Sequence, residues 1–152
     1  MLAIARENPN QPDVLALLHE SDAYSAARYP PESQHLIDPA ALSRPDVRFL
    51  VARRSGRAVG CGALVLTGDC SAELKRMIVA ETARGQGVGR TILEQLEATA
   101  RREHVRIIHL ETGIYNDAAL RTYRAAGYRA CGPFGTYAVD PLSVFLQKEL
   151  TP

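Results

Sequence analysis

The 152-residue sequence has no tryptophan, only three cysteines and no long apolar run. Cys61, Cys70 and Cys131 form no CxxC pair, so neither a disulfide framework nor a zinc site is expected. Free thiols of this kind are typical of a reducing cytosol. No segment approaches the roughly 18 apolar residues that span a bilayer, and the N-terminal segment is too polar for a secretion signal. The sequence predicts a soluble, cytoplasmic protein without a metal.

An excess of charge of either sign is missing as well. Eighteen basic and 17 acidic side chains leave a formal net charge of +1. No broad electrostatic attraction to nucleic acid or to an anionic membrane is therefore expected. Apolar residues make up 46% and charged residues 23% of the chain, which is ordinary for one globular domain of this length. Local positive charge can still hold a small anionic ligand.

Apolar spacing and chain-breaking residues predict alternating strands and helices. The expected elements are a strand at 2–6, a helix at 12–27, a proline-rich loop at 27–46 with a short helix near 39–42, two strands within 48–66, a strand at 73–80, a helix from 88, a strand at 105–112, a helix at 116–127 and closing strands. On the helix from 88, Glu97 and Arg101 are expected to pair on the outer face. This order predicts a mixed α/β sheet with helices packed on it.

Three glycines, Gly85, Gly87 and Gly89, alternate just before that helix. A glycine loop that enters a helix N-terminus is typical of an anion site, because free N–H groups and the helix dipole point at the ligand. Neither the phosphate loop GxxxxGK[ST] nor the dinucleotide pattern GxGxxG fits, since Arg90 or Ile92 stands where each pattern requires a later glycine. For the loop alone, a tight strand-to-helix turn remains the alternative.

Two motifs in this order resemble the GCN5-related N-acetyltransferases, the GNAT family. Arg84–Gly89 fits the family's [RQ]xxGx[GA] loop, and Asn116–Tyr128 fits NxxAxxxYxxxG followed by an aromatic residue. The resemblance implies a single acetyltransferase domain over residues 1–152, in which 1–47 shape the acceptor site and 48–149 bind acetyl-coenzyme A. The implied fold is a single mixed β-sheet, flanked by helices and splayed at its centre between the strands at 73–80 and 105–112.

By this resemblance the glycine loop holds the diphosphate of acetyl-coenzyme A, and the splayed strand before it pairs with the pantetheine arm. Arg84 and Arg90 add positive charge beside the phosphates, unless they are ordinary solvated surface. Asn116 is expected to contact the pantetheine arm, to cap the following helix, or to do both. The residues expected to bind the cofactor are Met77, Ile78, Val79, Arg84, Gly85, Gln86, Gly87, Val88, Gly89, Arg90, Asn116 and Tyr123.

Acetyl transfer to an amine needs a neutral nucleophile, a donor for the oxyanion and a proton for the departing thiolate. A lysine-like amine has a pKa near ~10.4 and is mostly protonated at neutral pH. A backbone N–H near Met77 or Ile78 is the simplest oxyanion donor. Tyr123 stands where the resemblance places the tyrosine that protonates the leaving group. Its alternative role is packing on the sheet.

Glu73 is the candidate base. Two-residue alternation places it on the same strand face as Lys75, Met77 and Val79. A salt bridge to a neighbouring basic side chain is its alternative role. Glu111 on the adjacent strand is the reserve candidate, and solvent can also take the proton.

The sequence is interpreted as an acyltransferase that moves an acetyl group from acetyl-coenzyme A to a primary amine of a small molecule, by direct transfer in a ternary complex. The alternatives are a protein acetyltransferase acting on lysine or an N-terminus, and a non-catalytic coenzyme A-binding module. The sequence leaves the acceptor and the oligomeric state open, a homodimer included. The rims of the acceptor site are expected at 29–32 and 132–141. The side chains that can touch the acceptor, unless they are loop surface, are Tyr29, Glu32, His35 and Tyr137.

Overall fold

The computed structural model describes residues 1–151, which form a seven-stranded sheet in the order β1-β2-β3-β4-β5-β7-β6. The strands are β1 Leu2–Arg6, β2 Val47–Arg54, β3 Arg57–Leu66, β4 Ser71–Val79, β5 Ile107–Gly113, β6 Arg129–Ala130 and β7 Ser143–Glu149. The helices are α1 Pro12–Arg28, α2 Val88–Arg102 and α3 Asp117–Ala125. Neighbouring strands are antiparallel except for β4 and β5, which are parallel. The predicted mixed sheet flanked by helices is confirmed.

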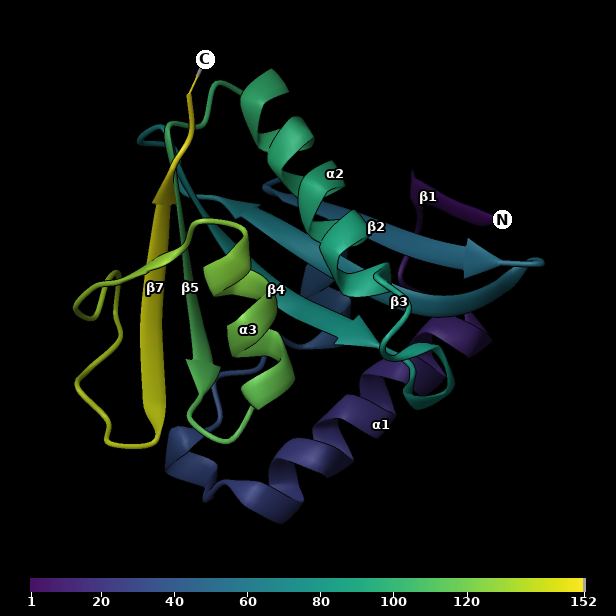
Figure 1. The fold of residues 1–152 in the computed structure, drawn as a ribbon, viewed down its shortest axis with the longest axis horizontal. Helices are drawn as coiled ribbons and strands as arrows, with labels where there is room; N and C mark the ends of the chain where they lie inside the picture. The colour runs from purple at the N-terminus through teal and green to yellow at the C-terminus, as the bar shows by residue number, and fades with distance from the viewer. Residues whose placement is uncertain (152) are drawn as a thin grey trace.

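The helices cover both faces of this sheet. Figure 1 shows α2 and α3 together on the near face, with α1 crossing behind. Successive side chains of β2 point to opposite faces of the sheet and pack against the helices on both. Leu50 packs in the cluster beneath α2, while Phe49 and Val51 pack with Val14 and other residues of the α1 side. Among residues 1–151, no helix has both the length and the apolar content needed to cross a membrane.

The α2 helix buries the apolar stripe that its sequence predicts, but the expected Glu97–Arg101 pair is wrong. Glu97 is 6% exposed and accepts hydrogen bonds from the Tyr128 hydroxyl and from Lys148 Nζ, both at 2.9 Å. Arg101 donates instead to the Thr151 carbonyl at 3.1 Å. Both partners of Glu97 come from segments distant in the chain, so helical spacing could not reveal them.

The predicted splay at the centre of the sheet is confirmed. β4 and β5 pair only over Ser71–Leu74 and Ile107–Leu110. Beyond these residues β4 continues along β3 and β5 continues along β7, so their facing edges part toward the lower side of Figure 1. The backbone groups on these edges therefore have no partner strand.

A β-bulge accompanies this parting. Cys61 pairs with Ile78 and Ala63 pairs with Lys75, so β4 holds one more residue than β3 between the two pairs. Arg76 lies within this interval and has φ 55°, a conformation that L-residues rarely adopt. The extra residue changes the side-chain alternation of β4 at the point where the strand leaves β5.

The bulge overturns one prediction about β4. Strict alternation predicts a shared face for Glu73, Lys75, Met77 and Val79, but Met77 and Val79 pack in the cluster beneath α2. Ile78 packs on the α1 side, where Glu73 and Lys75 also lie. One inserted residue reverses every later side chain of a strand, and the sequence gives no signal of the insertion.

Gly60 on β3 lies directly beneath α2 and offers a test of this packing. In Gly60→Ala the new Cβ would lie 2.8 Å from Ile92 Cδ1 and 2.9 Å from the Ile78 carbonyl oxygen. Because the strand backbone cannot swing aside, urea unfolding should show a loss of about 1–3 kcal/mol in the free energy of unfolding. In the control Gly132→Ala nothing lies within 4 Å of the new Cβ, so the change should stay within about 0.5 kcal/mol. Equal losses would contradict the close β3–α2 contact.

Candidate functional site

The glycine loop joins the free end of β4 to the N-terminus of α2 and exposes its backbone N–H groups. Gly85 and Gly87 have φ values of 75° and 78°, and an added Cβ at either would meet nothing within 4 Å. Within residues 1–151, the backbone N–H groups of residues 85–90 meet no hydrogen-bond acceptor. Gly89 has a different role, because a Cβ there would touch the Val79 side chain at 3.4 Å. The loop therefore offers a row of free donors at a helix N-terminus, which suits an anion.

Basic side chains surround this loop. Arg84 and Arg90 are exposed, and Arg90 pairs with Glu94 of its own helix at 3.2 Å. Sequence reasoning missed Arg54, which comes from the end of β2 and hydrogen-bonds to the side chain of Gln86. No local pattern marks Arg54, because only the sheet brings the β2–β3 hairpin beside the loop.

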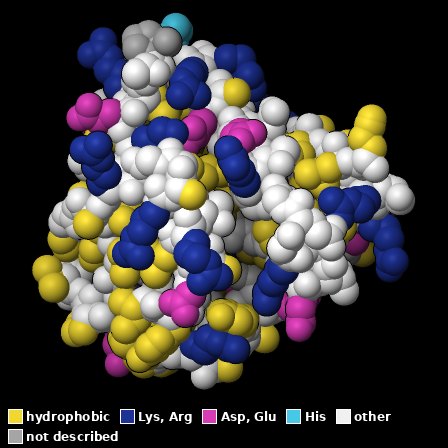
Figure 2. Space-filling model, viewed as in Figure 1, with side chains coloured by type: hydrophobic (Ala, Val, Ile, Leu, Met, Phe, Trp, Pro, Cys, Tyr) yellow, Lys and Arg dark blue, Asp and Glu magenta, His cyan; other side chains and the backbone are white. Residues whose placement is uncertain are grey.

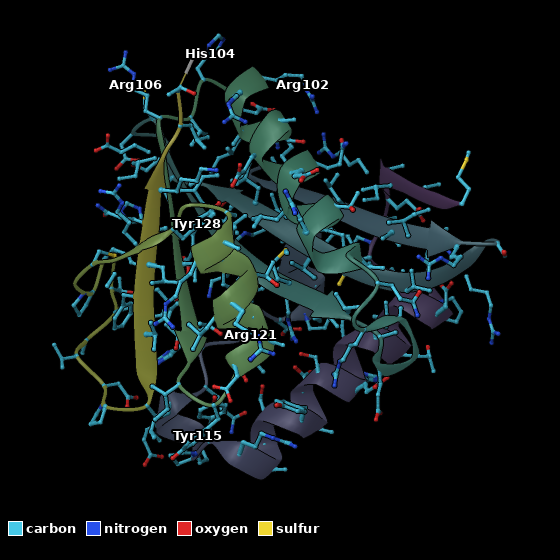
Figure 3. All side chains as sticks on the ribbon, in the orientation of Figure 1. Arg102, His104, Arg106, Tyr115, Arg121 and Tyr128 are labelled. Carbon is cyan, nitrogen blue, oxygen red and sulfur yellow. The ribbon has the colours of Figure 1, made fainter. Side chains whose placement is uncertain are left out.

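A cavity of about 510 Å³ lies between α2 and α3 on the same side of the sheet. Figure 2 shows Lys and Arg side chains spread over this face, and Figure 3 shows Arg121 on α3. The charged residues that line the cavity are Arg90, Glu94, Glu97, Arg121 and Lys148. Glu97 is already held by Lys148, so the two arginines are the basic groups left to meet a ligand.

Tyr123 on α3 is buried, and its ring packs edge-on against Tyr128 with the centroids 5.8 Å apart. Its hydroxyl makes no hydrogen bond with residues 1–151. The Tyr123 hydroxyl therefore belongs to a largely buried side chain and has no hydrogen-bond partner within residues 1–151. Burial raises the pKa of Tyr123 above its usual value, so the phenol keeps its proton at physiological pH.

Asn116 is the N-cap residue of α3, as predicted, but its side chain makes no capping hydrogen bond. The amide donates instead to Thr112 Oγ1 at 3.0 Å, and its oxygen accepts a 3.4 Å hydrogen bond from the Tyr29 hydroxyl. That hydroxyl also accepts from the Tyr115 backbone N–H at 3.0 Å. The backbone at Gly113 leaves room for Tyr29, because an added Cβ would collide with the phenol.

Tyr29 was expected at the rim of the acceptor site and is instead 7% exposed. It follows α1, and its ring stacks on Tyr115 with the centroids 5.5 Å apart. Figure 3 shows Tyr115 near that end of α1. Tyr29 thus ties α1 to the turn that starts α3. Glu32, another expected rim residue, is exposed.

Glu73 lies on the other side of the sheet, beneath two converging loops. Its carboxylate accepts a hydrogen bond from the Tyr137 hydroxyl and pairs with Lys75 Nζ at 3.3 Å. Lys75 Nζ also donates to Tyr137 at 2.8 Å and to the His35 carbonyl at 2.9 Å. The structure thus brings together three residues that the sequence singled out separately, Glu73, His35 and Tyr137. It also forms the salt bridge that was the alternative role for Glu73.

Glu111 lies on the same side, just past the point where β5 leaves β4. No basic side chain within residues 1–151 forms a salt bridge with it, and the nearby Ser143 hydroxyl is the side-chain group placed to donate a hydrogen bond to its carboxylate. Burial raises the pKa of Glu111 above its ordinary value of 4.5. Glu111 is therefore a partly buried carboxylate without a counter-ion beside the parted strands.

The other nucleophilic and metal-binding groups do not converge. Cys61 is buried, Cys70 is exposed and Cys131 is partly buried, and all three are free thiols. Over residues 1–151, no group of three or more His, Cys, Asp or Glu side chains could hold a metal ion. Within residues 1–151, the candidate site therefore has a donor-rich loop and a buried phenol on the α2–α3 side, two carboxylates on the opposite side of the sheet, and two parted strand edges between them.

Comparisons with known proteins agree on the kind of enzyme that carries such a site. Residues 14–128 match the model of the acetyltransferase (GNAT) family. The chain is 48% identical over 150 residues to an IAA acetyltransferase of Azospirillum brasilense, with 98% of each chain covered. A crystal structure of a Klebsiella pneumoniae protein superposes with a TM-score of 0.84 at 35% identity, covering 99% of both chains. PaiA N-acetyltransferase of Thermoplasma acidophilum, solved in complex with coenzyme A, shares the fold with a TM-score of 0.79 at 16% identity, again covering 99% of both chains. The chain belongs to the acetyltransferase (GNAT) family and is an acetyltransferase.

Proposed function

We propose that this acetyltransferase moves the acetyl group of acetyl-coenzyme A to a primary amine of a small molecule, by direct transfer in a ternary complex. The observation that carries the proposal is the row of free N–H groups at residues 85–90, which begins where the unpaired edge of β4 ends. A diphosphate needs such donors, and an amide-bearing arm needs such a strand edge. The strand edge and the free N–H groups follow one another along the chain, so one extended ligand could place its amide-bearing arm on the first and its diphosphate on the second.

The described residues fit the rest of that ligand. Met77, Ile78 and Val79 supply the strand edge, and the loop from Arg84 to Arg90 supplies N–H groups and positive charge. The cavity beside Arg90 and Arg121 is wide enough for the nucleotide end. Coenzyme A supplies the thioester, and the protein supplies the alignment of the acceptor and the transfer of protons.

Tyr123 is the proposed general acid. In the reaction the amine nitrogen bonds to the acetyl carbon, the carbon–sulfur bond breaks, and the leaving sulfur takes a proton. The Tyr123 phenol is free of partners and stays protonated, since burial raises its pKa. A backbone N–H near Met77 or Ile78 on the free edge of β4 is the proposed oxyanion donor.

Two carboxylates are candidates for the base. Glu73 stays the candidate that the sequence favours, although Tyr137 and Lys75 already engage it. Glu111 has no basic partner within residues 1–151, only the Ser143 hydroxyl beside it, and burial raises the pKa of its carboxyl toward the range in which a base works best. We therefore propose Glu111 as the group that takes the amine proton, with Glu73 holding the Tyr137 loop in place.

The acceptor side favours a small molecule over a protein. Lys75 joins the loop of His35 to the loop of Tyr137 above Glu73. Ser33 Oγ donates to Asp140 Oδ2 at 2.6 Å and links the same two loops again. An extended peptide needs an open groove, whereas these contacts close the approach from two sides.

The alternative of a non-catalytic coenzyme A-binding module is tested by mixing the protein with acetyl-coenzyme A and amines and following the release of free thiol.

The role of the glycine loop is tested by Gly87→Val. A β-branched side chain at φ 78° strains the loop and obstructs the free N–H groups, so acetyl-coenzyme A affinity measured by calorimetry should fall about tenfold or more. Gly68→Val is the matched control, because Gly68 has φ 84° and open space around it in the β3–β4 turn. It should lose similar stability and keep its affinity. A folded Gly87→Val protein with unchanged affinity would refute the assignment.

Tyr123→Phe tests the general acid, since it keeps the ring packed against Tyr128 and removes only the hydroxyl. The phenol acts mainly in the transition state, so kcat should fall by about 10²–10⁴-fold with little change in cofactor affinity. Steady-state kinetics and calorimetry measure the two quantities. Lower affinity with normal turnover would make Tyr123 a binding or packing residue.

Glu111→Gln and Glu73→Gln form a matched pair that tests the base. Wild-type kcat/KM should fall as pH drops through the raised pKa of Glu111, and Glu111→Gln should lose both activity and this dependence.

The raised pKa of Glu111 also affects stability. Burial raises this pKa in the folded state, so the folded protein disfavours the charged carboxylate at neutral pH. Glu111→Gln should therefore be at least as stable as wild type at pH 7, by thermal unfolding, and lose this advantage below about pH 4. A flat profile in Glu73→Gln alone would assign the base to Glu73.

A further inference from the structure

The surroundings of Glu111 carry information about the acceptor. Glu73, Lys75 and His35 all lie close enough to influence the Glu111 charge. Within this group Glu73 and Lys75 neutralise each other through their 3.3 Å salt bridge. Glu111 remains as one partly buried negative charge without a salt-bridge partner within residues 1–151. A buried charge is costly unless it is paired, so this site lacks one positive charge.

Lys75 is not available to bind an anionic group of the acceptor. An ammonium group has three N–H donors. Those of Lys75 meet the Glu73 carboxylate, the Tyr137 hydroxyl and the His35 carbonyl. Arg76, the nearest other cation on β4, is also occupied, since its buried guanidinium pairs with Asp22 at 2.5 Å. Lys75 and Arg76 therefore offer no free ammonium or guanidinium group to a carboxylate on the acceptor, and the remaining basic side chain near Glu111, His35, packs its ring against Tyr137.

Aromatic rings form the rest of these surroundings. Phe145 is the cross-strand partner of Glu111, and its ring lies 5.6 Å from the ring of Tyr137. His35 packs edge-on against Tyr137 with the centroids 5.1 Å apart. Tyr29 lies near enough for the Glu111 charge to affect its hydroxyl. Rings beside a carboxylate suit the apolar carbon atoms next to an ammonium group and attract the cation itself.

We infer that the acceptor is an amine whose nitrogen is attached to an apolar or aromatic carbon framework and that carries no carboxylate beside the nitrogen. The amine arrives as an ammonium ion and supplies the positive charge that Glu111 lacks. α-Amino acids are rejected, because their carboxylate meets Glu111 and finds Lys75 fully engaged. This inference rests on the proposed function and narrows its acceptor from amines in general to one chemical class.

The test compares acceptors that differ in a single group. Wild-type enzyme is assayed for thiol release with acetyl-coenzyme A and 2-phenylethylamine, phenylalanine or phenylalaninamide. The kcat/KM for the amine should exceed that for phenylalanine by about tenfold or more, because like charges repel across a partly buried site. Phenylalaninamide, which keeps the size without the charge, should behave more like the amine. Equal use of phenylalanine, or equal rejection of phenylalaninamide, would overturn the inference.

Glu111→Gln separates charge from other causes of selectivity. If Glu111 also serves as the base, this variant loses turnover with every acceptor, but the ratio between acceptors stays measurable. That ratio should fall several-fold toward unity in Glu111→Gln and stay unchanged in Glu20→Gln, an exposed glutamate on α1. An unchanged ratio in Glu111→Gln would refute the role of its charge. Wild-type enzyme that releases no thiol with any amine, while still binding acetyl-coenzyme A by calorimetry, would refute the proposed function itself.

Discussion

The parting of β4 from β5 after Leu74 and Leu110 is the constraint on which the rest of the site depends. A parallel pair would normally continue its ladder, and here a bulge at Arg76 turns β4 away. A non-glycine residue at positive φ costs about 1–3 kcal/mol and persists only when its surroundings hold it. The Arg76 guanidinium is held by Asp22 and by the Ile37 carbonyl at 3.0 Å. The α1 helix and the loop at Ile37 thus stabilise the parting of β4 from β5.

The parted strands β4 and β5 lie between a positively charged surface and a negatively charged one, although the net charge of the chain is only +1. On the α2–α3 side, free N–H groups and the basic residues Arg90 and Arg121 suit an anionic ligand. On the α1 side, Glu111 suits a cationic one, since Lys75 already neutralises Glu73. Tyr123 lies on α3, the helix beside the parted strands, and its side chain is largely buried. The proposed anionic cofactor and cationic amine would therefore bind on different surfaces of the sheet.

Tyr29 connects these two sides mechanically. It ends α1 on the acceptor side, yet its hydroxyl binds the Tyr115 backbone and the Asn116 side chain at the start of α3. The ring of Tyr29 fits here only because residue 113 is glycine, since a Cβ at that position would collide with the phenol. Since Tyr123 is carried on the same short helix, the position of its phenol depends on this contact. Tyr29, which the sequence also allowed to be loop surface, therefore helps to position α3 and the proposed general acid on it.

The sequence by itself determined the features that depend on local geometry. Glycine at 85 and 87 was recognisable because these positions need positive φ, and helices and strands followed from their own apolar periods. Only the tertiary structure decided the environment of individual side chains. Glu97 was assigned to solvent because its actual partners lie on other elements, and the side chain of Asn116, at the predicted N-cap, bonds to Tyr29 and Thr112 instead of to the helix. The face of Met77 was reversed by the bulge at Arg76, which Asp22 holds from a distant helix. Local conformation is a property of neighbouring residues, whereas burial and charge pairing are set by segments that meet only after folding.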